Sequence, residues 1–455
     1  MRYHYSTALS DGQGRILLLR EGSKWSLPSL DSDRFHSWQE VYKEHEQLQE
    51  ILGTNVVTMR LVCVDWNESV GRAIYLYARS IRDRDWRPPR GSSWFTAEEA
   101  CELPLRDPDP RPVLKSWHAW VASQTSYQPL PWSQLDWYEE AFGWADAALR
   151  ARGCEPVGEY QQITSRPRGT VFRIGTTDGE MFLKGVSRVF HHEPALAMWL
   201  WRRYPEQSVE VIAESSAGGL YLSASAGRVT LADLADRGVW LSAIKVFSRL
   251  QVSTVTQLAE ITALGVHTYC VPDYCSHLQS LLKTDLQLSD SQIEQLRTQI
   301  PTIQDIVSKL GDDHVPMGLE HGDLSPWQIM VDGTDIRFLD WSDSTIAHPF
   351  FSLVGFLGML RSLRESGSCD VISMLDPALD PALDPALEDD LIAAYLEPWE
   401  AYGSIERLRA SFRAATKLHP LHCALKFPRF LSCGLDPEWD FSGGIEMHLR
   451  ELISR

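Results

Sequence analysis

Two aspartates in one short segment are the residues best suited to chemistry. Asp323 follows His-Gly in a polar loop, and Gln328 stands five residues further on. Two apolar runs joined by the turn Asp332-Gly333 come next, a pattern that predicts a β-hairpin whose second strand returns Asp340 to the loop. Phosphoryl transfer uses one carboxylate beside the attacking hydroxyl group and another on the metal ion. The segment therefore predicts a phosphotransferase site.

The residue types suggest a role for each side chain. Phosphoryl transfer asks a protein mainly to position the reactants and to neutralise charge. We therefore expect Asp323 to orient the hydroxyl group, and Asp340 and the side-chain carbonyl of Gln328 to hold magnesium, which prefers oxygen ligands. We expect His321 to stabilise the loop. The alternative is that His-Gly-Asp is a chance tripeptide in a turn and that Asp340 only caps the next segment.

The segment HGDLSPWQ, followed by FLDWSDSTIAHPFFSL, resembles the signature of the aminoglycoside phosphotransferase superfamily, which consists of small-molecule kinases with a protein-kinase fold. The resemblance implies that Asp323 is the catalytic base and that Asp340 is a metal ligand. It also implies a bilobal fold, with ATP or GTP and Mg²⁺ as cofactors. This chain departs from the family at Gln328, which stands where the family has a metal-binding asparagine. Glutamine keeps the carbonyl ligand but adds a methylene group.

Upstream residues fit the smaller lobe of such a fold, which we place at residues 132–227 with a bracing helix at its start. Lys184 ends the apolar strand MFLK, and Glu193 begins a helix. In kinases a lysine on a strand holds the phosphates and a helical glutamate orients it. Arg168, in the turn SRPRGT, is a further candidate phosphate contact, together with the backbone N–H groups of that turn.

Residues 228–455 read as a mainly α-helical large lobe. We expect a helix that starts after Thr230 and ends near Gly238, and further helices over residues 240–250, 278–306 and 387–399. The repeat LDPALDPALDPAL, residues 375–387, predicts an exposed loop because its prolines prevent a regular helix. The segment HTYCVPDYCSH holds four potential zinc ligands, but their spacing is too tight for a standard zinc site, so we expect ordinary packing.

Residues 1–120 read as a separate α+β domain, joined to the rest by a linker at residues 121–131. The order of the motif WSLP (residues 25–28), a helix over residues 37–52 that stops at Gly53, and further strands resembles a Nudix domain. The catalytic helix is degenerate, because Glu50 alone keeps the family's register. We therefore expect this domain to be non-catalytic; the family has Arg, Glu and Glu where this chain has Glu46, Gln47 and Ile51.

Composition narrows the possible partners. The chain has 455 residues, with 43 basic and 61 acidic side chains and a net charge of -18. This charge argues against nucleic acid or an anionic membrane surface and is compatible with a cationic substrate, although it also suits a merely solvated surface. The eight cysteines form no disulfide framework, and there is no apolar run long enough for a membrane span. We therefore expect a cytoplasmic protein.

The sequence thus predicts an α+β chain in which a Nudix-like domain precedes a bilobal kinase-like domain. The predicted activity is nucleotide- and magnesium-dependent phosphorylation of a hydroxyl group on a small molecule. Two alternatives from other classes stay open. One is a pseudokinase that serves as a binding or regulatory module, which Gln328 would suit. The other is a diphosphate hydrolase that acts through the first domain and depends on Glu50.

Overall fold

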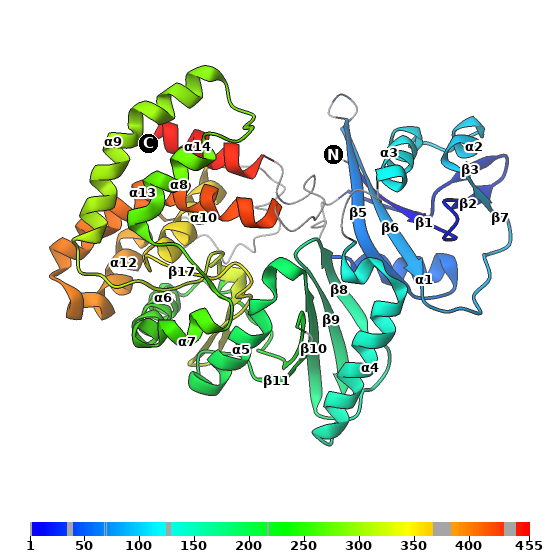
Figure 1. The fold of residues 1–455 in the computed structure, drawn as a ribbon. Coiled ribbons are helices and arrows are strands. Elements are labelled where there is room, and N and C mark those ends of the chain that lie inside the picture. Colours follow the sequence, from blue (N-terminus) through cyan, green and yellow to red (C-terminus); the bar gives the residue numbers. More distant parts are fainter. Residues whose placement is uncertain are drawn as a thin grey trace. The chain divides into compact units, whose positions relative to one another are not determined.

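The computed structural model describes residues 2–33, 40–67, 69, 71–123, 129–215, 218–366, 384–431 and 443–455. Helices and strands are mixed along the whole chain (Figure 1), which agrees with the expected α+β class at that level. Residue contacts divide the chain into two compact units. The first unit consists mainly of Met1–Ser187, and the second of Arg188–Cys433 and Pro437–Arg455.

The first unit begins with a four-stranded sheet of order β4-β1-β6-β5. Strand β1 runs parallel to β6, so these two strands, far apart in sequence, form the middle of the sheet. A second sheet has the order β3-β2-β7. The elements are β1 (Arg2–Leu9), β2 (Ile16–Glu21), β3 (Lys24–Ser26), β4 (Ser29–Ser32), β5 (Val56–Asn67), β6 (Arg72–Ile81), β7 (Ser92–Phe95), α1 (Tyr42–Leu52), α2 (Ala97–Glu102) and α3 (Arg111–Ser123).

Helix α1 ends where the sequence predicts and starts later than predicted. It stops at Gly53, whose φ of 70° is a left-handed conformation that glycine adopts readily. Its described part starts at Tyr42, because the two residues before it still pair with the strand Gln161–Arg166. The Val41 N–H donates to the Ile163 carbonyl oxygen, and Glu40 forms a β-bridge with Thr164. Part of the predicted start, residues 37–39, lies outside the described residues. A buried ion pair between Glu44 and Arg79 of β6 fixes the helix to the sheet.

The rest of the first unit contains α4 (Leu135–Ala151), followed by three consecutive antiparallel strands, β8 (Gln161–Arg166), β9 (Gly169–Thr176) and β10 (Gly179–Val186). The aromatic side chains of α4 form core contacts. Trp137 lies edge-on to Tyr138, with ring centroids 5.1 Å apart. A Cβ atom at Gly185 would come within 2.7 Å of the Trp137 ring, so glycine permits this close packing.

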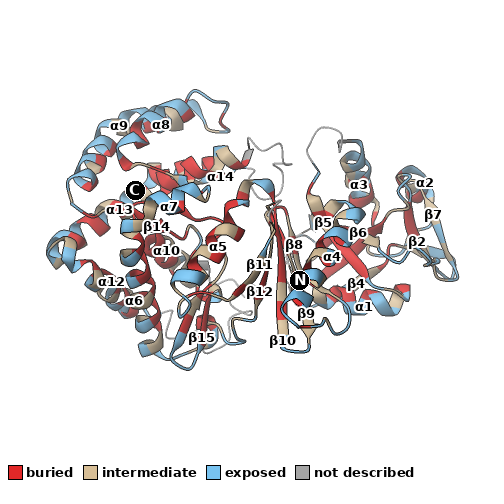
Figure 2. Cartoon of the chain, turned by 60° about the horizontal axis from the view of Figure 1, so that its bottom comes forward, coloured by how far each residue is buried: buried red, intermediate tan, exposed pale blue. Residues whose placement is uncertain are grey.

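The second unit is mainly helical around one large apolar core. Figure 2 shows that most of α10 is buried, whereas the outer face of α9 is exposed. Its helices are α5 (His192–Arg203), α6 (Arg237–Thr254), α7 (Leu258–Ala263), α8 (Tyr274–Leu281), α9 (Asp290–Gly311), α10 (Phe351–Ser366), α12 (Pro385–Leu396), α13 (Ile405–Leu431) and α14 (Gly444–Ser454). Its strands are β11 (Val211–Glu214), β12 (Leu220–Ala224), β13 (His267–Thr268), β14 (Gly318–Glu320), β15 (Ile329–Asp332), β16 (Asp335–Phe338) and β17 (Thr345–Ala347).

Three helix predictions in this unit need correction. The helix after Thr230 is only a single 3-10 turn, and Gly238 lies in the first turn of α6 instead of at a helix end. The reason is a second cap: the Asp236 carboxylate accepts a hydrogen bond from the Gly238 N–H at 2.7 Å and starts a new helix. The predicted helix 278–306 is broken between α8 and α9, because Ser289 caps α9. Likewise, the helix over 387–399 ends as α-helix at Leu396 and continues as a 3-10 turn.

Part of the proline repeat, residues 375–383, lies outside the described residues, and its last residues begin α12. Within the described part of the chain, no helix combines the length and apolar character that a membrane crossing requires.

Candidate functional site

The predicted hairpin is confirmed, and it lies next to the His-Gly-Asp loop. Strands β15 and β16 pair antiparallel, with Ile329 opposite Phe338. Beyond their ends the Leu339 N–H donates to the Gln328 carbonyl at 2.9 Å, so Gln328 and Asp340 emerge at the same end of the hairpin. The loop itself follows β14, which pairs with β17. The hairpin thus returns the chain from Gln328 to Asp340.

Gly322 allows the loop to pass close to the segment after Asp340. Its φ is 84°, and a Cβ atom at this position would lie 2.1 Å from the Asp343 carbonyl oxygen. A side chain would therefore clash with backbone that has no room to move. The glycine of His-Gly-Asp is required by packing as well as by conformation.

Asp323 and Gln328 are in direct contact. The Gln328 side-chain Nε2 donates to Asp323 Oδ2 at 3.3 Å, and the Ser325 hydroxyl donates to Gln328 Oε1 at 3.1 Å. Asp323 itself is exposed, so its carboxylate is accessible to a substrate. A carbonyl oxygen has two lone pairs, so Oε1 keeps the capacity to ligate a cation. The glutamine can therefore both orient the aspartate and supply the ligand expected of it.

Asp340 adopts an unusual backbone conformation for a residue other than glycine, with a φ of 58°. The Ser342 hydroxyl donates to Asp340 Oδ1 at 2.7 Å, which holds the carboxylate. Positive φ at a non-glycine residue concentrates at functional sites, where the surrounding structure maintains it. The strand-to-loop transition after β16 thus fixes the orientation of this side chain.

Two further polar side chains, Glu193 and Tyr221, lie in the neighbourhood of Asp340. Glu193 is in the first turn of α5 and is fully buried, and it accepts a hydrogen bond of 3.1 Å from the Tyr221 hydroxyl of β12. Burial first, and then the charges of Glu193 and Asp340, raise the pKa of Tyr221 well above its usual value. The phenol therefore stays protonated and acts as a donor. It links the predicted helical glutamate to the neighbourhood of the predicted metal ligand.

Lys184 and Arg168 belong to the first unit. Lys184 lies on β10 and is 9% exposed, and Arg168 lies in the turn between β8 and β9. Glu193 belongs to the second unit, because the division falls between Ser187 and Arg188. The pairing of Lys184 with Glu193, and the contact of Lys184 and Arg168 with phosphate, stay predictions. The boundaries 121–131 and 227 also stay predictions; α3 continues to Ser123, inside the expected linker.

His321 stabilises the loop, as expected. Its backbone N–H donates to the Ser352 hydroxyl at 3.0 Å, and its ring Nε2 lies 2.9 Å from the Leu339 carbonyl oxygen. Burial lowers the pKa of His321, so the ring is neutral and Nε2 carries the proton that it donates. The histidine therefore fastens the loop to the residue just before Asp340.

The residues that support the two aspartates and Glu193 were not expected from the sequence. Tyr221 lies on β12, for which the sequence indicated no side chain with a role. Ser325 and Ser342 lie two residues after Asp323 and Asp340, and this repeated Asp-x-Ser spacing is a signal that could have indicated them.

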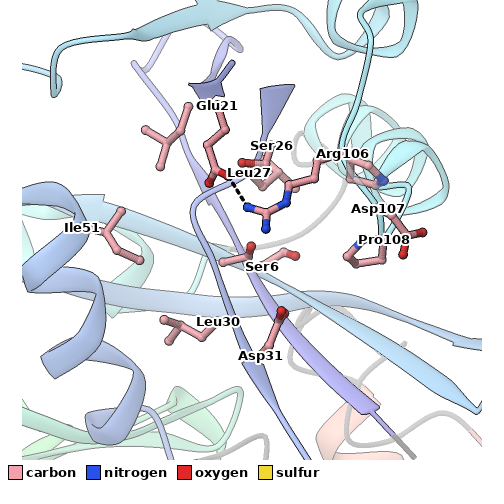
Figure 3. Close-up of a pocket in the computed structure, with 13 residues that line it drawn as sticks. Ser6, Glu21, Ser26, Leu27, Leu30, Asp31, Ile51, Arg106, Asp107 and Pro108 are labelled. Atoms are coloured by element: carbon pink, nitrogen blue, oxygen red, sulfur yellow. Dashed lines mark hydrogen bonds and ion pairs between the residues drawn. The ribbon is translucent and has the colours of Figure 1, made fainter. Parts of the chain in front are cut away.

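The first unit contains a pocket of about 310 Å³ (Figure 3). Its lining includes Ile51 of α1 but neither Glu46 nor Glu50. Each carboxylate that does line it has a basic partner, as Figure 3 shows for Glu21 and Arg106. The other two pairs are Asp31 with His4, at 2.5 Å, and Asp107 with Arg72, at 3.2 Å. The carboxylates that line the pocket therefore already have side-chain partners.

Among the described residues, no three His, Cys, Asp or Glu side chains come together in a way that could hold a metal ion by themselves. This finding covers the cluster of His267, Cys270, Cys275 and His277, for which ordinary packing was expected. The rings of His267 and Tyr269 pack with centroids 4.6 Å apart. Both cysteines of the cluster are free thiols.

Comparison with known proteins gives matches in structure only. No protein-family model and no curated protein sequence matches this chain. A choline/ethanolamine kinase family protein from Mesorhizobium loti has 15% identity and a TM-score of 0.45, with 69% of this chain and 94% of that chain covered. The choline kinase LicA from Streptococcus pneumoniae has 11% identity and a TM-score of 0.45, with 69% and 98% covered. A type I macrolide 2′-phosphotransferase has 12% identity and a TM-score of 0.39, with 68% and 96% covered.

Proposed function

We propose that this protein transfers a phosphoryl group from a nucleoside triphosphate to a hydroxyl group of a small molecule. The observation that carries the proposal is the direct support of Asp323 by the Gln328 side chain, whose backbone also bonds to the residue before Asp340. The loop and the hairpin thereby present an exposed carboxylate beside a second, fixed carboxylate. This is the minimum that phosphoryl transfer asks of a protein.

In the proposed reaction Asp323 acts on the acceptor. Its exposed carboxylate accepts a hydrogen bond from the acceptor hydroxyl and orients the oxygen toward the γ-phosphorus. The new O–P bond forms as the bond between the γ-phosphorus and the bridging oxygen breaks, and the acceptor proton passes to Asp323. The Gln328 amide keeps the carboxylate in place, because its N–H group donates to Asp323 Oδ2.

The other groups of the loop fit Mg²⁺. Asp340 supplies a carboxylate and Gln328 a carbonyl oxygen, and both are the hard oxygen ligands that this ion prefers. Magnesium, when bound, would neutralise charge on the phosphates. The Ser342 hydroxyl holds one Asp340 oxygen at 2.7 Å, which reduces the freedom of the carboxylate before a cation arrives. The ATP or GTP requirement, the kinase-like bilobal fold and the phosphate contacts of Lys184 and Arg168 belong to the same proposal.

The charge of the site bears on the acceptor. Asp323, Asp340 and Glu193 are all acidic, and the whole chain carries a net charge of -18. Such a field raises the local concentration of cations. We therefore place a hydroxylated molecule with a positive charge first among the acceptors to test.

The first unit enters the proposal as a Nudix-like domain without catalysis of its own. The support is the exposed position of Glu46 and Glu50 on α1, since neither residue lines the pocket. Glu46 receives only a long hydrogen bond of 3.4 Å from Gln161. A diphosphate hydrolase site would need several carboxylates gathered around metal ions.

The test is magnesium-dependent nucleotide turnover measured across a panel of hydroxylated acceptors, cationic and neutral, with wild type and Asp340→Asn. We expect at least one acceptor to stimulate turnover by wild type, and we expect Asp340→Asn to lose that stimulation. Wild type that binds nucleotide but turns over none with any acceptor would instead indicate a binding or regulatory module.

A further inference from the structure

A buried charge network lies beneath the His-Gly-Asp loop, in residues to which the proposed mechanism assigns no role. Its members come from separate elements of the second unit and are at most 6% exposed. They are Glu320 of β14, Thr345 of β17, Tyr274 of α8, and His422 and Lys426 of α13. Ionisable side chains buried to this degree are rare unless they are paired.

The Glu320 carboxylate is fully engaged. Oε1 accepts a hydrogen bond of 2.8 Å from the Gly322 N–H. Oε2 accepts one of 2.8 Å from the Thr345 hydroxyl, which lies directly opposite on the paired strand, and lies 3.5 Å from His422 Nε2. One oxygen of the carboxylate, Oε1, therefore holds the loop, and the other, Oε2, contacts side chains of the core.

Lys426 holds the same glycine from its other side. Its Nζ donates to the Gly322 carbonyl oxygen at 3.2 Å. The charge of Lys426, opposed by burial, helps to lower the pKa of Glu320, and the charge of Glu320 in turn raises the pKa of Lys426. Both groups are therefore charged at neutral pH. The N–H and C=O groups of Gly322 are thus each held by one of two opposite buried charges.

His422 and Tyr274 determine which groups donate and which accept the hydrogen bonds of this network. Burial lowers the pKa of His422 to about 4, so its ring is neutral and carries one proton. Burial also raises the pKa of Tyr274 well above its usual value, so the phenol remains a donor, and its oxygen lies 2.7 Å from His422 Nδ1. The tyrosine donates to Nδ1, which places the histidine proton on Nε2, facing Glu320.

Burying two opposite charges is a poor way to gain stability, because desolvation offsets their attraction and apolar side chains of similar volume often do as well. The position of these two charges indicates another role, since Asp323 is the next residue after the glycine that they hold. We propose that Glu320 and Lys426 are positioning residues that clamp the backbone of Gly322 on both sides and thereby set the direction of the Asp323 carboxylate. This inference rests on the proposed phosphotransferase function.

Two variants test the clamp. The double variant Glu320→Leu/Lys426→Met removes both charges and the acceptor of the Gly322 N–H together, so neither charge is left buried alone. Glu320→Asp keeps the charge pair but withdraws the carboxylate from the Gly322 N–H by one methylene group. Glu388→Gln is the matched control, because this half-buried glutamate pairs with Arg361 and Arg364 between α10 and α12.

We expect both clamp variants to fold, with kcat reduced about 10–100-fold, since a small misplacement of a reacting group has effects of this size. The KM for nucleotide should stay within about threefold of wild type, because a positioning residue acts on the reacting step. The control should keep the wild-type kcat. A folded Glu320→Asp or double variant with wild-type kcat would overturn the proposal.

Hydrogen exchange at the Gly322 amide separates this inference from the proposed function. We expect faster exchange in both clamp variants, with exchange of the core helices unchanged, whether or not an acceptor has been found. If the amide exchanges at the wild-type rate, the clamp does not exist. If it exchanges faster but wild type phosphorylates no acceptor, the proposed function fails and the role assigned to the clamp fails with it.

Discussion

Two regions of this chain carry carboxylates in patterns typical of phosphate chemistry, and the structure treats them differently. In the second unit, Asp323 and Asp340 are each held by a neighbouring polar side chain, Gln328 and Ser342. In the first unit, Glu46 and Glu50 lie on the exposed face of α1, and the nearby pocket is lined by other carboxylates that have basic partners. Carboxylates form a candidate catalytic site only when neighbouring groups of the fold orient them. Helical spacing of the carboxylates is not enough by itself.

The same contrast applies to the buried charges. In the first unit, Arg79 of β6 pairs with Glu44 of α1 and so joins the helix to the sheet, and it bonds to Thr58 at 2.9 Å and to Thr7 at 2.7 Å on the other strands. In the second unit, Glu320 and Lys426 both bond to the backbone of one loop residue, Gly322. We therefore expect the first pair to govern stability and the second to govern catalysis.

The largest effect should come from Asp323→Asn. Loss of the carboxylate that receives the acceptor proton should lower kcat by about 10²–10⁴-fold, the usual range for a general base. Asp332→Asn is the matched control, because Asp332 is an exposed aspartate at the turn end of the same hairpin. Steady-state turnover of both variants tests this, and equal losses in the two would remove the special role of Asp323.

Arg79→Met should destabilise the first unit by about 3–5 kcal/mol, since it leaves the buried Glu44 carboxyl group without its partner. Chemical denaturation followed by tryptophan fluorescence would measure the loss, and the added substitution Glu44→Leu should restore much of it. A variant as stable as wild type would show that this ion pair does not hold α1 to the sheet.

Acid should weaken the second unit through His422. Its pKa is lowered from 6.5 to about 4 in the folded protein, so its contribution to stability is complete above pH 6.5 and is lost as the pH falls toward 4. The difference corresponds to at most about 3 kcal/mol. Melting temperatures across this pH range should fall less steeply for His422→Gln. An identical slope in the variant would contradict the buried, neutral histidine.

Gln328→Asn should have a moderate effect. The shorter side chain loses the 3.3 Å hydrogen bond to Asp323, and loss of about 1 kcal/mol corresponds to roughly a fivefold decrease in kcat. Turnover at saturating magnesium would measure it. If wild type turns over no nucleotide and Gln328→Asn does, the natural chain is a binding module. The extra methylene group of Gln328 would then be the cause of its inactivity.

Glu50→Gln should have no effect on nucleotide turnover, because Glu50 is exposed and does not line the pocket. Its stability should also change by less than about 0.5 kcal/mol, as for most surface substitutions. Release of phosphate from nucleoside diphosphate compounds is the sensitive assay. Activity that disappears in this variant would establish a hydrolase in the first unit.

The sequence predicts the local parts of the site and misses the distant ones. The Asp-Gly turn between two apolar runs is enough to place the β15–β16 hairpin, and with it Asp340 near Gln328. Lys426 gives no such signal, because it meets Gly322 only through the packing of α13 against the loop. Tyr221 is similarly hidden, since a strand pattern does not reveal which residue faces Glu193.

Helix boundaries fail for a related reason. Apolar periodicity continues across the caps at Asp236 and Ser289, so it does not show where one helix stops and another begins. The start of α1 is decided by bonds that Val41 makes to Ile163, far along the chain. Periodicity reports which face is buried, whereas boundaries depend on single hydrogen bonds.

Direct detection of a phosphorylated acceptor tests the central claim. Wild type, Asp323→Asn and Glu50→Gln would each be incubated with nucleotide, magnesium and the acceptor that best stimulates turnover, and the products separated by mass spectrometry. The account predicts phosphorylated acceptor from wild type and Glu50→Gln, and little or none from Asp323→Asn. Product from Asp323→Asn at the wild-type rate, with none from Glu50→Gln, would contradict it and place the chemistry in the first unit.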